Sequence, residues 1–297
     1  AWDRSVGQLA VFGGQTDSAA DESIGEGYPL ADTHAFDGGW SPGATIPDPD
    51  VLKSPPEVLG MSYPLGRLEP AVAYDPVGQR TLLFGGRAPI SQGGSWADGP
   101  MLGVVGDLWA LHLTNEVKSA VWRTEGSWER LYPTDPEGDG DPPTGMAQAM
   151  VYDADRQRVV LFGGMVRQDE QNFHSRALWE FDGTSWALLG DGEGMDPGEW
   201  PAGRSRARMV HDPQGGGVLL FGGGVTPLEA YLEGPESTQN PGSADFGSRC
   251  LGTPPTLLCN QSFGEELQPE TLFSDLWRWD GSAWEYLGSA EEAVGAW

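Results

Sequence analysis

Short apolar runs separated by polar and glycine-rich turns fill the chain, and they recur in a fixed order. Their length of a few residues and their β-branched and aromatic content are typical of strands. Four of the runs end in Phe-Gly-Gly: Leu9–Gly14, Thr81–Gly86, Val159–Gly164 and Val218–Gly223. Recurrence at this scale predicts a repeat architecture, so most of the conspicuous residues are expected to build the scaffold.

An aromatic residue or a histidine followed by aspartate precedes each of these strands. The four pairs are Trp2-Asp3, Tyr74-Asp75, Tyr152-Asp153 and His211-Asp212. The second glycine follows the aspartate by eleven residues in every copy. This constant spacing gives a register in which the four units can be aligned.

A second pair of strands, marked by tryptophan, is predicted after each Phe-Gly-Gly. In the third unit Ala177–Phe181 alternates, and Asp182-Gly183 indicates a hairpin turn before Trp186. His34 occupies the place of the first tryptophan in the first unit. The tryptophans assigned to this pattern are Trp109, Trp179 and Trp277 in third strands, and Trp40, Trp128, Trp186 and Trp284 in fourth strands.

The double glycines have a mechanical explanation. Strands that crowd toward a central axis leave no room for a Cβ, and the chain leaves such a strand through unusual φ and ψ angles. Tryptophans supply large apolar areas between neighbouring sheets. Four-stranded sheets repeated about an axis describe a β-propeller. The glycines are Gly13, Gly14, Gly85, Gly86, Gly163, Gly164, Gly222 and Gly223.

The order of these parts resembles the kelch repeat in its bacterial form. The resemblance extends from Ala1 to about Leu287, outside the loops, and His34 and His211 depart from the aromatic pattern. It implies an all-β fold: one kelch-type propeller domain over 1–297, with four-stranded blades. The expected blades cover 1–45, 67–131, 145–189 and 204–287.

The sequence leaves two alternatives for the number of blades. Kelch rings commonly have six or seven blades, and Ala1 aligns near the end of an innermost strand. We expect either a section of a larger ring or a ring closed by a terminal strand from Ala290–Trp297, and we favour the section.

The charge of the chain excludes several partners. With 44 acidic against 17 Lys and Arg residues, the net charge is −27. Nucleic-acid backbones and anionic membranes attract basic surfaces, so neither is expected as a partner. No apolar run approaches the roughly 20 residues of a membrane span, so direct membrane insertion is not expected either. The acidic balance, and Arg in place of Lys, suit a bacterial extracytoplasmic protein that is periplasmic, secreted or on the cell surface.

Cys250 and Cys259 lie in the longest insertion, 224–274, which is too rich in Pro, Gly and Ser to build its own core. Two close cysteines in such a loop indicate a disulfide, which would place the protein outside the cytoplasm. Two free buried thiols are the alternative. A zinc site is not expected, because no further His or Cys pair completes a ligand set.

The predicted insertions fall on one face. Strand direction alternates within a blade, so loops between second and third strands, and between blades, open on the same side. These segments carry about 26 of the 44 acidic residues. Turns on the other side are short, with the exception of Thr114–Ser127. Long loops on a rigid scaffold are where binding usually occurs.

Two loops between blades are candidate calcium sites. Carboxylates at alternate positions with glycine between them can surround Ca²⁺ with oxygen ligands. The first loop begins like an EF-hand but has Met146 at the twelfth position. Solvated acidic turns are the alternative. The candidate ligands are Asp135, Glu137, Asp139 and Asp141 in the first loop, and Asp191, Glu193 and Asp196 in the second.

No constellation in the sequence indicates catalysis. His34, His112 and His211 lie in or beside strands and are expected to be packing or surface residues, and His174 is alone in a loop. The two Tyr, two His and linked Cys of kelch-fold copper oxidases are not supported, and Phe-Gly-Gly is no phosphate loop. We therefore assign no catalytic or cofactor residues.

These observations favour a non-catalytic interaction or scaffold module. Its acidic loops are expected to bind a protein, a glycan or a neighbouring subunit of an assembly. Two alternatives remain: a carbohydrate-active enzyme that uses loop carboxylates, and a structural subunit stabilised by Ca²⁺.

Overall fold

The computed structural model is all-β. It describes residues 1–13, 31–36, 40–44, 63–90, 101–118, 121–168, 171–195, 198–225 and 271–289, and no helix occurs within these ranges. The chain forms two compact units. Unit 1 comprises Ala1–Pro133 and Thr144–Met146, and unit 2 comprises Thr134–Pro143 and Ala147–Trp297.

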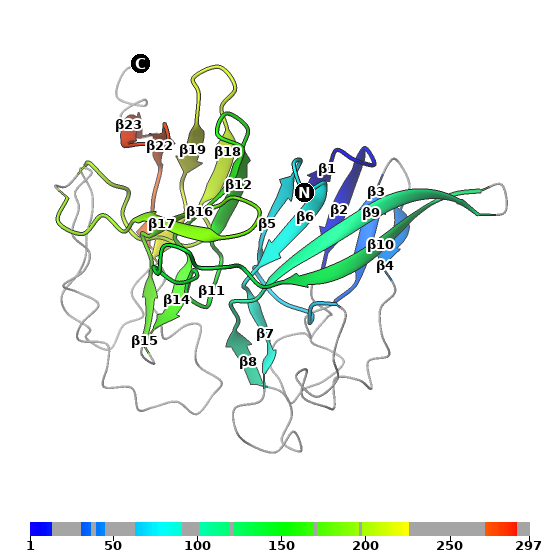
Figure 1. Cartoon of the computed structure of the whole chain (residues 1–297). Helices are drawn as coiled ribbons and strands as arrows, with labels where there is room; N and C mark the ends of the chain where they lie inside the picture. Colours follow the sequence, from blue (N-terminus) through cyan, green and yellow to red (C-terminus); the bar gives the residue numbers. More distant parts are fainter. Residues whose placement is uncertain are drawn as a thin grey trace. The chain divides into compact units, whose positions relative to one another are not determined.

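Unit 1 contains two four-stranded antiparallel sheets. Sheet 1 has the order β1 (Trp2–Asp3), β2 (Gln8–Phe12), β3 (Thr33–Phe36), β4 (Trp40–Ala44). Sheet 2 has the order β5 (Ala71–Asp75), β6 (Arg80–Phe84), β9 (Leu108–Lys118), β10 (Val121–Leu131). Figure 1 shows the strands of sheet 2 side by side, with β9 and β10 extending well beyond β5 and β6. The short strand β11 (Gly145–Met146) also belongs to this unit.

Unit 2 repeats the same arrangement. Sheet 3 has the order β12 (Ala149–Asp153), β13 (Arg158–Phe162), β16 (Leu178–Phe181), β17 (Trp186–Gly190). Sheet 4 has the order β18 (Arg208–His211), β19 (Val218–Phe221), β22 (Asp275–Trp279), β23 (Trp284–Ser289). The predicted four-stranded unit is therefore present four times.

The strand register agrees with the alignment of the four units. His34 pairs with Val11, Trp109 with Leu83, Trp179 with Leu161 and Trp277 with Leu220, at the same place in each sheet. A register shift follows in sheets 1, 3 and 4, where the third strand meets the fourth. In sheet 2, β9 and β10 pair without a shift from Leu108 and Leu131 to Lys118 and Val121. Thr114–Ser127 is therefore the middle of one long hairpin.

The repeated aspartate organises the turn between the first and second strands. The Oδ1 atom of Asp75 accepts hydrogen bonds from the backbone N–H groups of Val77 and Gly78, both at 3.0 Å. The equivalent aspartates accept from Ser5, from Asp155 and Arg156, and from Gln214. This is the Asx-turn geometry that aspartate favours. The fourth residue after each aspartate has a positive φ: Gly7, Gln79, Gln157 and Gly216.

The double glycines take the backbone conformations that the sequence predicts. Gly163 and Gly223 have φ of 71° and 85°. A Cβ on Gly163 would lie 2.6 Å from the carbonyl oxygen of Arg204, and one on Gly223 would lie 2.6 Å from that of Ser205. Both a left-handed conformation and a close backbone approach therefore require glycine here. Positive φ also occurs at Gly13, Gly85, Gly86, Gly164 and Gly222, whereas Gly14 lies outside the described residues.

Tryptophans fill the core between sheets 3 and 4. Trp277, Trp279 and Trp284 are buried together with Phe162 and Trp200. The rings of Phe162 and Trp284 meet edge-on at 5.5 Å between centroids. Trp109, Trp179 and Trp186 are also buried, which agrees with a packing role for the repeat tryptophans. The side chain of Trp40 lies outside the described part of the structure.

Short ladders follow three of the Phe-Gly-Gly strands, where the sequence indicated only loops. The pairs are β7 (Arg87–Ile90) with β8 (Met101–Val104), β14 (Met165–Gln168) with β15 (Gln171–His174), and β20 (Gly224–Val225) with β21 (Thr271–Leu272). The residues on either side of each insertion pair with each other, so each insertion begins on a two-stranded base.

Candidate functional site

A mixed group of one histidine and two carboxylates lies at one end of unit 2. Asp153 is the last residue of β12 and His211 is the last residue of β18, and these two first strands lie against each other. Asp155 follows in the turn that Asp153 organises. One potential ligand atom from each side chain lies within 4.8 Å of those from the other two.

The three side chains differ in exposure and contacts. His211 Nε2 lies 3.0 Å from Asp155 Oδ2 and 3.9 Å from Asp153 Oδ1. Asp153 is fully buried, the His211 side chain is 18% exposed, and the Asp155 side chain is 54% exposed. The group is therefore anchored in the core on one side and open to solvent on the other.

The charge of the group is only partly balanced. Arg156 donates to Asp153 Oδ2, the oxygen that does not face His211, and its Nε lies 3.5 Å from Glu180. The backbone N–H of Gly217 and the side chain of His211 lower the pKa of Asp155. Asp155 is therefore ionised at neutral pH, while the guanidinium of Arg156 is shared between Asp153 and Glu180.

The equivalent junction in unit 1 uses different chemistry. Tyr74 stands at the position of His211, and Ser5 stands at the position of Asp155. Burial raises the pKa of the Tyr74 hydroxyl, and the side chains of Ser5 and Asp3 act on it next, so these groups are neighbours. A neutral tyrosine–serine junction in unit 1 thus corresponds to an ionic histidine–aspartate junction in unit 2.

The first predicted calcium loop is organised by its own backbone. Asp135 Oδ1 accepts from the N–H groups of Gly138 and Asp139, at 2.7 and 3.1 Å, and Oδ2 accepts from Gly140. Asp139 Oδ2 accepts from the Leu188 backbone at 2.6 Å. Burial, together with the charges of Asp135 and Asp139, raises the pKa of Asp141. The described carboxylates of this loop do not form a group like that around His211.

The second calcium loop is described only in part. Asp191 accepts from the backbone N–H of Glu193 at 2.8 Å, and Asp196 lies outside the described residues. Cys250 and Cys259 also lie outside them. Calcium binding and the disulfide therefore stay predictions.

Sequence reasoning missed two arginine–aspartate pairs whose arginines are buried. Arg67 donates to Asp107 in sheet 2, and Arg204 donates to Asp275 in sheet 4. Each arginine also donates to the carbonyl of the first glycine of its Phe-Gly-Gly, at 3.0 and 3.1 Å. The indole N–H of Trp109 or Trp277 donates to the same aspartate.

A signal for these pairs exists in the sequence. Each arginine follows a glycine eight residues before the turn aspartate, and its partner stands two residues before the tryptophan. The third unit has Gly145 and Ala177 at these two positions, so both partners change together. There the Trp179 Nε1 atom is buried without a hydrogen-bond partner. The pairs are therefore structural.

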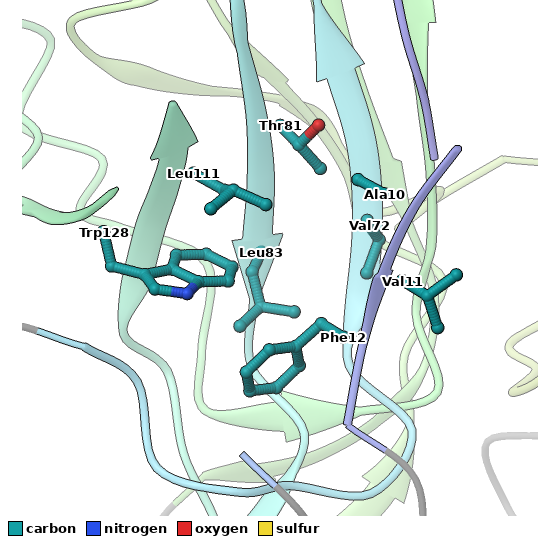
Figure 2. Close-up of a pocket in the computed structure, with 8 residues that line it drawn as sticks. All are labelled: Ala10, Val11, Phe12, Val72, Thr81, Leu83, Leu111 and Trp128. Atoms are coloured by element: carbon teal, nitrogen blue, oxygen red, sulfur yellow. The ribbon is translucent and has the colours of Figure 1, made fainter. Parts of the chain in front are cut away.

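A small pocket in unit 1 is apolar (Figure 2). The side chains of Phe12, Leu83, Leu111 and Trp128 surround it, and Thr81 contributes the hydroxyl. Its walls carry no titratable side chain. The pocket therefore offers no acid, base or charged nucleophile for catalysis.

Of the other described histidines, His34 and His112 each pair with an acid, whereas His174, which was expected in a loop, is the last residue of β15 and pairs with Met165. His34 Nε2 lies 2.6 Å from Asp32, and His112 Nε2 lies 3.2 Å from Glu129. Neither pair gathers a third ligand among the described residues. The group around His211 is thus the candidate metal centre of the part of the chain that the structure describes.

Comparison of the sequence with known proteins does not assign the chain to a family. Within the described ranges, no helix is both long and apolar enough to cross a membrane. No model of a known protein family matches the chain, and no curated protein matches it significantly.

Proposed function

We propose that this chain is a non-catalytic interaction module, a β-propeller or a section of one related to kelch repeats. Four sheets with the same strand order, equivalent register and the same aspartate turn support a blade-like repeat. The module would bind a protein partner or a neighbouring subunit outside the cytoplasm.

The observation that carries this proposal is the placement of the three ladders. The pairs β7–β8, β14–β15 and β20–β21 all begin directly after a Phe-Gly-Gly strand. Each insertion therefore starts from a hydrogen-bonded base that extends a core strand. Loops held by a rigid scaffold are suited to recognition. The first turns at the opposite ends of the strands remain short.

The acidic character of the insertions defines the partner chemistry. A strongly negative surface favours a basic partner and accelerates its association at low ionic strength. The described carboxylates Asp107 and Asp275 each accept hydrogen bonds from an arginine and a tryptophan, which supports a structural role for these two acids rather than a part in turnover.

Loop shortening tests the proposal. Residues 91–100 and 226–270 would be replaced by two-residue turns that keep the ladders intact. The matched control removes residues 115–124 from the β9–β10 hairpin, at the opposite end of the strands. A partner identified by cross-linking in the source cells would then be purified and its affinity measured by surface plasmon resonance.

The loop-shortened variants should unfold at the same temperature as the parent and lose the partner, whereas the control should keep it. Binding that survives both loop replacements would disprove the proposal. Turnover on a glycan panel, abolished by one carboxylate-to-amide substitution, would instead establish the carbohydrate-active alternative.

A further inference from the structure

We propose that Asp153, Asp155 and His211 form a binding site for a divalent first-row transition metal, with Zn²⁺ as its probe. This site lies on the short-turn side of unit 2 and is independent of the loops that carry the proposed interaction. Three features of the structure support it: ligand geometry, charge, and the contrast with unit 1.

The geometry is close to that of a metal centre. Zinc binds His nitrogen and carboxylate oxygen at about 2.0–2.2 Å, so tetrahedral ligand atoms stand about 3.3–3.6 Å apart. The distances from His211 Nε2 to Asp155 Oδ2 and Asp153 Oδ1, 3.0 and 3.9 Å, bracket this value. The third separation, between the Asp153 and Asp155 ligand atoms, is within 4.8 Å, so movements of the side chains alone could bring the three atoms around one ion. Three protein ligands leave a fourth position for water.

The charge of the site favours a dication. Asp153 and Asp155 oppose the positive charge of Arg156, which leaves one net negative charge when His211 is neutral; Glu180, whose pKa is raised by burial, is in turn acted on by both Arg156 and Arg158. Arg156 occupies Oδ2 of Asp153 and leaves Oδ1 facing the histidine. Oδ1 already accepts two backbone N–H groups, at 2.9 and 3.3 Å. Asp153 is therefore the weakest of the three ligands.

The ligand set selects the class of metal. A mixed set of imidazole and carboxylate suits Zn²⁺, Co²⁺ and Ni²⁺, whereas Ca²⁺ and Mg²⁺ prefer sites made of oxygen alone. Metal binding requires a neutral imidazole, because a protonated ring nitrogen has no lone pair to offer the ion.

The contrast with unit 1 shows that the junction does not need these ligands. At the equivalent positions, Tyr74 in the first strand of sheet 2 lies beside Ser5 in the turn that follows the first strand of sheet 1. The two positions that differ are the ones that provide the histidine and the exposed aspartate. A pure packing role is filled by tyrosine and serine elsewhere in the same chain.

The double variant Asp155→Ser/His211→Tyr converts the site into the unit 1 junction. The full chain, treated with chelator, would be titrated with ZnCl₂ by calorimetry at pH 7, and its melting temperature would be recorded with and without a 100-fold excess. We expect one zinc equivalent and a higher melting temperature in the parent. Both should be lost in the double variant, with affinity reduced at least about tenfold.

His112→Gln provides the matched control, because it removes a histidine that has one acidic partner, and it should keep the zinc equivalent. If the double variant fails to fold, the same titration is made with His211→Asn, since asparagine retains a donor for Asp155 but is a poor metal ligand. Absence of zinc binding in the parent, or zinc binding that survives in the folded double variant or in His211→Asn, would overturn the proposal. A higher affinity of the parent for Ca²⁺ than for Zn²⁺ would also overturn the proposal.

Discussion

The guanidinium of Arg204 donates two hydrogen bonds, of 2.5 and 2.8 Å, to the carboxylate of Asp275 inside unit 2. Both side chains are almost completely buried. Removing one partner of a buried ion pair leaves an uncompensated charge and costs about 3–5 kcal/mol. Asp275→Ala should therefore lower the free energy of unfolding of unit 2 by about that amount, measured by urea denaturation.

The double variant Arg204→Met/Asp275→Ala should recover most of this loss, since apolar replacement of both partners is often close to neutral. The third unit already has neither charge, with Gly145 and Ala177 at these positions. A double-mutant cycle gives the coupling directly. If the losses of unfolding free energy in the two single variants simply add up in the double variant, the two charges act independently.

Acid should weaken unit 1 through Asp107. Burial alone would raise the pKa of Asp107, but hydrogen bonds and charge from Arg67, with a bond from Trp109, hold it below the usual value. A carboxyl with a depressed folded-state pKa stabilises fully above the unfolded pKa of about 3.9, and this contribution is lost as the pH falls through the folded value. The stability of unit 1 should fall below about pH 4.

Thermal unfolding between pH 2 and pH 6 measures this effect. Asp107→Asn should flatten the dependence below pH 4 while lowering stability at pH 6. If the stability of Asp107→Asn still falls below pH 4 as steeply as that of the parent, other carboxyls cause the loss of stability in acid.

Replacing either of two threonines in unit 1 by valine should change the stability of the unit, in opposite directions for the two. The hydroxyl of Thr81 is buried at the apolar pocket without a hydrogen-bond partner, whereas that of Thr33 accepts from Trp128 Nε1 at 3.1 Å. Leaving a buried polar group unsatisfied costs about 1–3 kcal/mol, and a typical hydrogen bond contributes about 0.5–1.5 kcal/mol. Thr81→Val should raise the urea midpoint and Thr33→Val should lower it. The same sign for both would contradict the assignment.

Gly163 should tolerate alanine much less well than Gly138. Both have φ between 70° and 80°, but a Cβ on Gly163 would meet the Arg204 carbonyl at 2.6 Å, whereas Gly138 has nothing within 4 Å. The left-handed conformation costs about 1–2 kcal/mol at either site, and overpacking adds about 1–3 kcal/mol at Gly163. Calorimetric melting of the two variants compares these costs. Equal losses would mean that the strand end relaxes freely around Gly163.

Local sequence patterns predicted the sheets well, because the signals for strands and turns lie within a few residues of each other. Asp182-Gly183 marks its hairpin, and the aspartate register aligns Trp179 with Trp277 as their strand pairing requires. The ladders after Phe-Gly-Gly were read as loops, since 91–100 and 226–270 separate the strands of two of them and strands of two to four residues are too short to show a periodicity.

The candidate site could not be predicted in the same way. Asp155 and His211 are 56 residues apart, and only the packing of β18 against β12 brings them together. His211 was assigned to packing or the surface because the alignment places it in or beside a predicted strand. Arg67 and Asp107 are also distant in sequence, at 40 residues, although their recurrence in the fourth unit was visible.

The aspartate turn has a consequence for how such a repeat can change. Because one carboxylate fixes the backbone, the side chain of the second residue after it is released from defining the turn, and this residue differs in all four copies: Ser5, Val77, Asp155 and Gln214. New side-chain chemistry can therefore arise at these positions, by selection or by design, while the sheet behind them keeps its register. The same scaffold could in this way host different ligand sets in successive turns.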